Sequence, residues 1–291
     1  MSTLRTFHHS AFPAERLAVE RLETVSVVVP ARECAGTIGT VAAELVALRE
    51  QGVVDQVLVV DAGSSDGTAA AAAAAGADVV SEGTLLPEFG RVLGKGDAMW
   101  RALSVCTGDV VCFVDGDTAN FDAHFACGTL GPLLVERDVA YVKAFFQRPF
   151  RAGGEVLPND GGRVTELTAR PLLRRFWPEL ADVRQPLAGE MAARRSLLTQ
   201  LPWSTGFAIE TALLLDVYAK VGIRAIAQVD LDVRQNDHKP LPELAPMADE
   251  VLAAVTVRLE REGRLAGGGA DHGVPAIVER PPLDQVLQPA R

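Results

Sequence analysis

The chain has 291 residues, of which 48% are hydrophobic and 23% charged, and it carries a formal net charge of −10 at pH 7. This length allows one large domain with a full core. The acidic balance argues against a general DNA-binding surface, although it leaves room for a local basic pocket that binds a phosphorylated small molecule. The N-terminal residues lack the apolar core of a signal peptide, and no window reaches the ~18 apolar residues of a membrane span. We therefore expect a cytoplasmic protein that binds neither nucleic acid nor membrane.

The four cysteines are Cys34, Cys106, Cys112 and Cys127, and they form no CxxC pair and no zinc-type spacing. This pattern favours buried, apolar cysteines in a reducing compartment.

After an N-terminal arm, residues 1–23, the pattern becomes that of an α/β protein. Residues 24–30 (TVSVVVP) form a β-branched run that ends at a proline, which is typical of a strand buried on both faces. The following elements are expected to alternate: helix 36–51, strand 54–68 with its Gly/Ser/Asp loop, helix 69–76, strand 77–82, helix 94–107 and strand 108–117. Such alternation predicts a parallel, doubly wound sheet, whose ligands bind at the carboxyl ends of its strands.

After about residue 138 the alternation becomes less regular. The expected elements are strand 138–150, a glycine-rich loop leading into a helix (157–176), proline-broken segments, helix 208–221, strand 224–233 and amphipathic helix 241–262. The tail, residues 263–291, mixes glycine, proline and charge, and we expect it to be mobile. The chain thus divides into the arm, the halves 24–137 and 138–262 of one domain, and the tail.

Two acids, Asp115 and Asp117, end the apolar strand 108–117. Carboxylates this close would raise each other's pKa, and a divalent cation would neutralise them. Mg²⁺ binds through one or two carboxylates together with substrate phosphates, which suggests a diphosphate ligand. By itself such a triplet is most often a solvated turn, but its place at the end of a buried strand favours the metal interpretation.

Lys95 stands between two glycines just before a predicted helix. An ammonium group near a helix N-terminus suits phosphate binding, and a solvated surface lysine is the alternative. Residues 61–68 (DAGSSDGT) are glycine-rich but form neither a GxGxxG motif nor a P-loop, so a turn that caps the next helix at Ser65 or Asp66 also explains them.

Four segments, VSVVVPAREC, VVDAGSSDGT, GKGDAMWRAL and FVDGD, stand in the order and spacing of nucleotide-sugar glycosyltransferases of the GT-A type. Four downstream segments make the resemblance more specific: GGRVTELTARPLLRRFWPEL, QPLAGEMAARRSLLTQLPW, GFAIETALLLD and AIAQVDLDVRQNDHKPLPEL. Over roughly residues 24 to 258 the chain resembles the glucosyl-3-phosphoglycerate synthases and the related mannosyl-3-phosphoglycerate synthases of actinobacteria.

The resemblance implies a GT-A type α/β fold, with a parallel-rich nucleotide-sugar-binding sheet flanked by helices and a C-terminal acceptor-binding portion. It assigns the sugar nucleotide to the half 24–137 and the acceptor to the half 138–262. The implied activity is metal-dependent, retaining transfer of glucose from UDP- or GDP-glucose to the 2-hydroxyl of 3-phosphoglycerate, with Mg²⁺ or Mn²⁺ as cofactor and a homodimer as the assembly. A mannosyl enzyme using GDP-mannose is the alternative, followed by a nucleotidyltransferase and by a non-catalytic nucleotide-sugar-binding protein.

Residue by residue, the resemblance assigns ten positions to the donor: Pro30, Ala31, Glu33, Asp61, Ala62, Lys95, Asp115, Gly116, Leu187 and Glu190. It assigns four positions to the acceptor: Gly162, Arg163, Thr165 and Asn236. The implied metal ligands are Asp117 and His238, and the implied catalytic residues are Asp117, Lys95 and Glu210.

Two positions depart from the pattern of the family. The family commonly has a glutamate where this chain has Cys34, and we expect the neighbouring Glu33 to take over its contact with the base. Glucosyl enzymes commonly place a metal-binding histidine where this chain has Asn236, so His238 is favoured as the ligand and Asn236 is the alternative.

Glu210 is the obvious candidate for a carboxylate nucleophile, as in retaining glycosidases. It would otherwise orient the sugar hydroxyls or stabilise a helix N-terminus. A front-face transfer, in which the leaving diphosphate helps to deprotonate the acceptor, needs no nucleophile.

Overall fold

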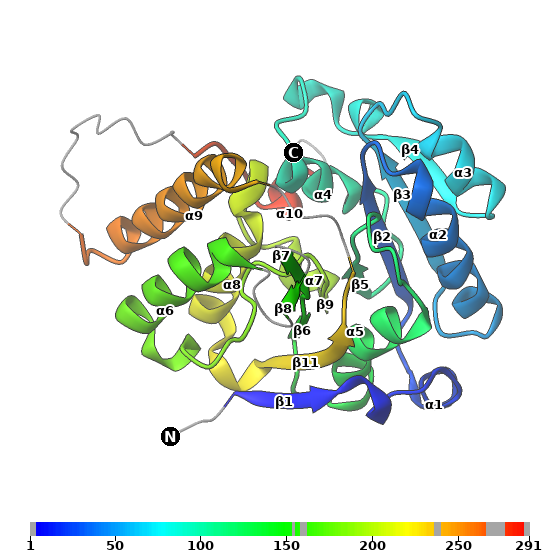
Figure 1. Cartoon of the computed structure of the whole chain (residues 1–291), viewed down its shortest axis with the longest axis horizontal. Helices are drawn as coiled ribbons and strands as arrows, with labels where there is room; N and C mark the ends of the chain where they lie inside the picture. The colour runs from blue at the N-terminus through cyan, green and yellow to red at the C-terminus, as the bar shows by residue number, and fades with distance from the viewer. Residues whose placement is uncertain (1–3, 153–154, 158–161, 236–239, 266–276, 288–291) are drawn as a thin grey trace.

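A computed structural model describes residues 4–152, 155–157, 162–235, 240–265 and 277–287 of the chain. An eight-stranded sheet with strand order β1-β11-β6-β9-β5-β2-β3-β4 crosses its centre (Figure 1). Its strands are β1 (Arg5–His8), β2 (Val25–Ala31), β3 (Gln56–Asp61), β4 (Asp78–Ser81), β5 (Val110–Phe113), β6 (Tyr141–Gln147), β9 (Met191–Arg194) and β11 (Ile226–Val233). Neighbouring strands are parallel except β9, which runs antiparallel to both β5 and β6.

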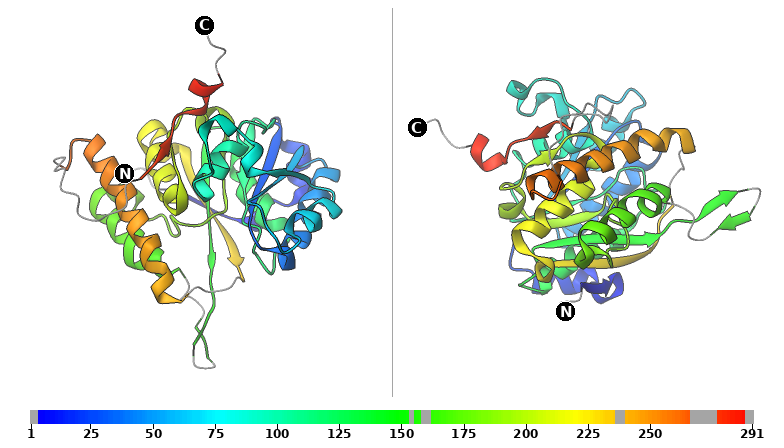
Figure 2. Two further views of the ribbon diagram at one scale, coloured as in Figure 1. Left: turned by 90° about the horizontal axis from the view of Figure 1, so that it is seen from above. Right: turned by 90° about the vertical axis from the view of Figure 1, so that its left-hand side faces the viewer.

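Two short antiparallel pairs lie outside this sheet. They are β7 (Phe150–Ala152) with β8 (Glu155–Leu157), and β10 (Trp203–Ser204) with β12 (Glu279–Arg280). Figure 2 shows β7 and β8 projecting away from the body of the molecule.

Helices cover both faces of the sheet (Figure 2). They are α1 (Ala14–Glu20), α2 (Ala35–Glu50), α3 (Thr68–Ala74), α4 (Lys95–Ala102), α5 (Ala123–Val135), α6 (Arg170–Phe176), α7 (Arg195–Leu198), α8 (Ile209–Val221), α9 (Leu241–Arg261) and α10 (Leu283–Val286). No helix in the described part of the chain is both long and apolar enough to cross a membrane.

Alternate residues of β2 enter opposite cores, as the period of a strand requires. Val27 and Val29 pack in the core that α2 and α5 cover, whereas Val28 packs in the core that α4, α8 and α9 cover. Burial on both faces explains why this strand is apolar except at Ser26, whose buried hydroxyl donates to Gln56 Oε1 at 2.7 Å.

The predicted alternation of strands and helices is confirmed from β2 to β5, and the parallel-rich α/β fold class is confirmed with it. The sheet is parallel-rich rather than parallel throughout, because β9, which the proline-broken segment after α6 supplies, runs antiparallel to both of its neighbours. The strand β9 has only 4 residues, too few for a clear period-two pattern. Helix α5 is a further element that the sequence reading did not assign.

Within the N-terminal arm, residues 4–20 pack against the rest of the fold. Strand β1 pairs in parallel with β11 at the edge of the sheet. Leu17 of α1 is completely buried in the core shared with α5.

Residues 277–287 also differ from the expected mobile tail. Strand β12 pairs with β10, and Leu283 of α10 is completely buried. The indole N–H of Trp100 donates to the Pro281 carbonyl at 2.9 Å. For these residues the prediction of a mobile tail is wrong, because apolar and charged contacts hold them against α4.

Replacing Arg280 by glutamine is expected to lower the free energy of unfolding by about 3 kcal/mol. The Asp97 carboxylate is completely buried and accepts from Arg280 Nε at 2.9 Å and Nη2 at 2.6 Å, and from Arg101 Nε at 3.1 Å. Without Arg280 it keeps fewer donors around a buried charge. Urea unfolding measures the loss. Arg261→Gln is the matched control, because Arg261 pairs with Glu279 of the same segment but is half exposed; equal losses in the two variants would contradict the prediction.

Candidate active site

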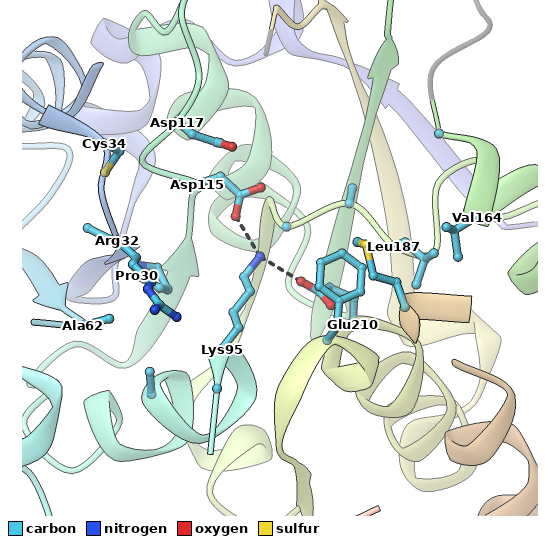
Figure 3. Close-up of a pocket in the computed structure, with 18 of the residues that line it drawn as sticks. Pro30, Arg32, Cys34, Ala62, Lys95, Asp115, Asp117, Val164, Leu187 and Glu210 are labelled. Atoms are coloured by element: carbon cyan, nitrogen blue, oxygen red, sulfur yellow. Dashed lines mark hydrogen bonds and ion pairs between the residues drawn. The ribbon is translucent and has the colours of Figure 1, made fainter. Parts of the chain in front are cut away.

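A cavity of about 570 Å³ opens at the carboxyl ends of the parallel strands. Pro30 and Ala31 at the end of β2, Ala62 after β3, and Asp115 and Asp117 after β5 line one side of it. The other side comes from the second half of the chain, with the following lining residues: Gly162, Arg163, Val164, Thr165, Leu187, Phe207 and Glu210. Figure 3 shows Lys95 between these two sides.

Lys95 bridges two carboxylates inside the cavity (Figure 3). Its Nζ donates to Asp115 Oδ1 at 2.8 Å and lies 2.8 Å from Glu210 Oε1. Burial lowers the pKa of Lys95, but the two carboxylates outweigh burial and raise the pKa above its usual value. Lys95 is therefore a fixed cation, held at the first residue of α4.

The glycines on either side of Lys95 explain how its helix reaches the cavity. Gly94 has a φ of +95°, in the left-handed region that favours glycine. A Cβ on Gly96 would lie 2.1 Å from the Ser204 carbonyl oxygen, so only glycine lets α4 pack this closely against β10. The sequence GKG thus combines a turn, a cation and a close helix contact.

Arg234 is the centre of a second charge cluster and directly follows β11. Its side chain is 3% exposed and contacts three carboxylates. Nη1 donates to Asp115 Oδ2 at 3.0 Å and lies 3.0 Å from Glu190 Oε1, and Nη2 donates to Asp117 Oδ1 at 2.8 Å. One guanidinium therefore ties both acids of the DGD triplet to a buried glutamate.

Opposing effects set the protonation of the carboxyl groups. Burial raises the pKa of Asp115, but Lys95 and Arg234 lower it further, so that its pKa lies well below the usual range. Burial raises the pKa of Glu190, and Arg234 only partly opposes that effect. Asp115 is thus an anion held between two cations.

Gly189 lets the Asp115 carboxylate take this position. A Cβ on Gly189 would lie 2.3 Å from both carboxylate oxygens of Asp115, which is far closer than any real contact. The backbone that passes under Asp115 must therefore be glycine, because any side chain would displace the carboxylate from Lys95 and Arg234.

The structure brings eleven of the residues assigned by the resemblance to the cavity: Pro30, Ala31, Ala62, Lys95, Asp115, Asp117, Gly162, Arg163, Thr165, Leu187 and Glu210. Four others do not line it: Glu33, Asp61, Gly116 and Glu190. The remaining two, Asn236 and His238, lie outside the described residues.

Glu33 and Asp61 hold loops instead of lining the cavity. Glu33 Oε1 accepts from the backbone N–H of Ser65 at 2.7 Å, which ties the loop after β2 to the loop after β3. The Asp61 carboxylate accepts from the backbone N–H groups of Gly63 and Ser64, each at 3.1 Å. The expected contact of Glu33 with a nucleobase has no geometric support here.

Several charged residues at the cavity were not assigned from the sequence. Arg32, Glu82 and Arg234 line it, and each directly follows a strand of the sheet. Asp115 was predicted as a site residue because it lies just beyond a buried strand, and the same argument could have identified these three residues. Lys143 is different, because it lies in the middle of β6, is 1% exposed, and donates to the Ala188 carbonyl at 2.5 Å. Burial lowers its pKa to about 8.

Asp117 has the donor atoms and exposure that a divalent cation requires. Its side chain is 61% exposed, and Arg234 engages Oδ1. Carboxylate oxygens are preferred ligands of hard cations, whose remaining ligands then come from phosphates and water. The residues present therefore fit a metal bound between Asp117 and a diphosphate.

A second group of potential metal ligands lies among the described residues, away from the lining of the cavity. It consists of His8, His9 and Asp232, whose ligand atoms lie within 4.8 Å of one another. Asp232 already contacts His9 Nε2 at 2.7 Å and His8 Nε2 at 3.2 Å. Hydrogen bonds between these groups account for the arrangement without a cation.

Comparison with known proteins gives the family. The model of glycosyl transferase family 2 matches residues 26–142. The glucosyl-3-phosphoglycerate synthase of Mycolicibacterium smegmatis is 45% identical over 245 residues, which is 84% of this chain and 80% of that protein. The protein of the same name from Mycobacterium tuberculosis H37Rv is 40% identical over 301 residues, covering 98% and 92%.

Solved structures agree with this comparison. The mannosyl-3-phosphoglycerate synthase of Rubrobacter xylanophilus superposes with a TM-score of 0.88 at 44% identity, covering 98% of each chain. The Mycobacterium tuberculosis glucosyl-3-phosphoglycerate synthase with Mn²⁺, UDP and phosphoglyceric acid superposes with a TM-score of 0.85 at 39% identity, covering 97% of this chain and 99% of that one. A further structure of that enzyme contains Mg²⁺ and UDP. Because the identity extends over most of both chains, this protein belongs to the glucosyl-3-phosphoglycerate synthase family of glycosyltransferases.

Proposed function

We propose that the chain transfers glucose, with retention of configuration, from UDP- or GDP-glucose to the 2-hydroxyl of 3-phosphoglycerate. One observation carries this proposal. A single cavity joins the Lys95, Asp115 and Asp117 cluster, suited to a diphosphate and a metal, to the Gly162–Thr165 segment, suited to an anionic acceptor. We propose accordingly that residues 24–137 bind the donor and residues 138–262 bind the acceptor, with Leu187 and Glu210 of the second half also reaching the donor sugar.

The donor side of the cavity holds a positive charge where the leaving diphosphate would develop negative charge. Lys95 is a fixed ammonium group in the cavity and would stabilise the departing diphosphate, with no reorganisation during the reaction. A divalent cation, Mg²⁺ or Mn²⁺, bound at Asp117 would supply Lewis-acid stabilisation of the same charge. Pro30, Ala31, Ala62 and Leu187 would shape the walls around the nucleoside and sugar.

Glu210 is better placed to orient the sugar than to attack it. Its Oε1 pairs with Lys95 at 2.8 Å, and this ion pair makes the carboxylate a weaker nucleophile. Its Oε2 is buried and has no hydrogen-bond partner in the described chain, although Glu210 lines the cavity. A hydroxyl group of the bound hexose would satisfy that oxygen. We therefore favour a front-face transfer.

Glu190 would act through another residue. It is completely buried and pairs with Arg234, which in turn holds Asp115 and Asp117. This arrangement supports a positioning role for Glu190 rather than contact with the sugar.

On the acceptor side, Gly162, Arg163 and Thr165 line the cavity from one short segment. Gly162 has a φ of +79°, and a guanidinium beside backbone N–H groups and a hydroxyl is a good receptor for phosphate or carboxylate. These features support the assignment of 3-phosphoglycerate to this end.

Arg163→Ala is expected to raise the KM for 3-phosphoglycerate by about tenfold to a hundredfold, because a charge-assisted hydrogen bond to the acceptor is lost. The KM for the sugar nucleotide should stay within about twofold, since the donor side of the cavity is unchanged. Steady-state kinetics with each substrate varied in turn measures the two constants. Arg170→Ala is a control, because Arg170 pairs with Glu166 and is absent from the cavity lining. Equal effects on both constants in Arg163→Ala would contradict the acceptor role.

Product analysis tests the function itself. The enzyme is incubated with 3-phosphoglycerate, a divalent metal and UDP-glucose, GDP-glucose or GDP-mannose, and the products are identified by mass spectrometry and NMR. Glucosyl-3-phosphoglycerate supports the proposal. Exclusive use of GDP-mannose would replace it with the mannosyl activity, which the likeness to the Rubrobacter protein keeps as the second candidate. Release of hexose 1-phosphate from the sugar nucleotide would indicate a nucleotidyltransferase, and binding without turnover a non-catalytic protein.

A homodimer and a cytoplasmic location are further parts of the proposal. Leu241 and Leu252 of α9 are 61% and 40% exposed, and an exposed apolar helix face supports an interface. Light scattering distinguishes the monomer of 30.9 kDa from twice that mass.

A further inference from the structure

Two charged side chains stand at the end of the cavity where the nucleoside would lie. Arg32 directly follows β2, and Glu82 directly follows β4 at the carboxyl edge of the sheet. Both line the cavity with Pro30 and Ala62. Figure 3 shows Arg32 beside Pro30, on the opposite side of Lys95 from Leu187. Arg32 therefore lies away from the Glu210 and Leu187 side of the cavity, which we assign to the hexose.

Among the described residues, neither the Arg32 guanidinium nor the Glu82 carboxylate has a hydrogen-bond or ion-pair partner. Lys95, Asp115 and Arg234 differ, because each is paired inside the same cavity. Burial, followed by the charge of Asp97, raises the pKa of Glu82, and the charge of Arg32 opposes them. The half-buried Glu82 carboxylate can therefore accept hydrogen bonds from a ligand, and the nearby Arg32 guanidinium can donate them.

The chemistry of these two groups distinguishes one nucleobase from the other. Guanine presents N1–H and N2–H₂ side by side, and a carboxylate accepts from both at once; its O6 and N7 accept together from one guanidinium. Uracil offers a single N–H between two carbonyl oxygens. A carboxylate facing uracil makes one hydrogen bond at most and meets a carbonyl oxygen with its second oxygen.

We infer that Glu82, together with Arg32, selects a guanine base, so that the preferred donor of this enzyme is a GDP-hexose rather than a UDP-hexose. The inference rests on the proposed function, since it concerns the donor end of the same cavity. Glu82 accepts from the N1–H and N2–H₂ edge, and Arg32 donates to the O6 and N7 edge. A site built to hydrogen-bond a donor group rejects the analogue that lacks it, so a preference of at least about tenfold is expected.

Binding of the free nucleotides tests the inference without any turnover. Isothermal titration calorimetry with GDP and with UDP, each in the presence of Mg²⁺, is expected to give a Kd for GDP at least about tenfold lower. Glu82→Gln retains the shape but loses one acceptor and the charge, and should bring the two Kd values within about threefold by weakening GDP alone. Arg32→Met is a second variant on the other edge and should also weaken GDP more than UDP.

Glu88→Gln is the matched control, because Glu88 is an exposed acid of the same connection between β4 and α4 and does not line the cavity. It should leave the ratio of Kd values unchanged. UDP binding as tightly as GDP in the wild type, or an equal loss of both nucleotides in Glu82→Gln, would overturn the inference. Preferential GDP binding without any hexosyl transfer would refute the proposed function and leave the base selection standing.

Discussion

Asp117→Ala is expected to lower kcat by about a thousandfold while the protein stays folded. The carboxylate has the exposure and the donor atoms of the metal ligand, and no other described residue offers an equivalent exposed carboxylate beside Asp115. Its loss should cost at most about 1 kcal/mol of unfolding free energy, since the side chain is 61% exposed and Arg234 keeps Asp115 and Glu190 as partners.

Metal titration and unfolding are measured together on this variant. The wild type should lose transfer in EDTA and regain it with Mg²⁺ or Mn²⁺, whereas Asp117→Ala should not recover at any metal concentration that the wild type tolerates. Asp138→Ala is the matched control, because Asp138 pairs with Arg5 on the surface, and it should keep full activity. Full activity of the wild type in EDTA would contradict a metal-dependent mechanism.

Arg234→Gln is expected to lower both stability and activity. Removal of a buried cation leaves Asp115 and Glu190 without their shared partner, which costs about 3–5 kcal/mol of unfolding free energy. Transfer should fall by about a hundredfold or more, because Asp115 and Asp117 lose the group that holds them in place. Arg234→Lys should recover only part of either loss, since one ammonium group cannot replace the forked contacts of a guanidinium with three carboxylates.

The pH dependence of stability separates this electrostatic effect from a packing defect. In the wild type, the lowered pKa of Asp115 means that its stabilising contribution is present above the pKa of the unfolded chain and is lost as the pH falls through the folded pKa. In Arg234→Gln the buried carboxyl groups protonate at higher pH, and protonation removes the unpaired charge. The difference in unfolding free energy between wild type and variant should therefore shrink from pH 7 toward about pH 4.5. A constant difference would indicate lost packing instead.

Strands buried on both faces were predictable from composition alone. Both faces of β2 are buried, so apolar side chains are favoured on each face and the run of valines identifies the strand without tertiary information. The place of Asp115 and Asp117 at the cavity was predictable as well, because they follow an apolar strand and parallel strands bring their carboxyl ends to one edge. Lys95 was predictable from its place at the start of a helix.

Strand β9 was not predictable in the same way. It pairs antiparallel with both β5 and β6, although α6 and other segments separate it from them in the sequence. Its 4 residues are too few to show the alternation of apolar and polar residues that marks a strand. The C-terminal residues 277–287 follow a segment rich in glycine. Nevertheless, Arg280 donates a hydrogen bond to the buried carboxylate of Asp97, which lies 183 positions earlier in the chain. Such contacts form between segments that are far apart in the sequence, so local composition does not predict them.

The sequence by itself determined the α/β class, the edge of the sheet where the cavity opens, and the family, because hydrophobic periodicity and short motifs are local properties of the chain. The tertiary structure alone decided how the charges are shared: Lys95 between Asp115 and Glu210, and Arg234 among Asp115, Asp117 and Glu190. It also left Arg32 and Glu82 at the cavity without a hydrogen bond or ion pair to any described residue. The physical reason is that an ion pair depends on distance and burial in three dimensions, and residues more than a hundred positions apart acquire both only when the sheet has formed.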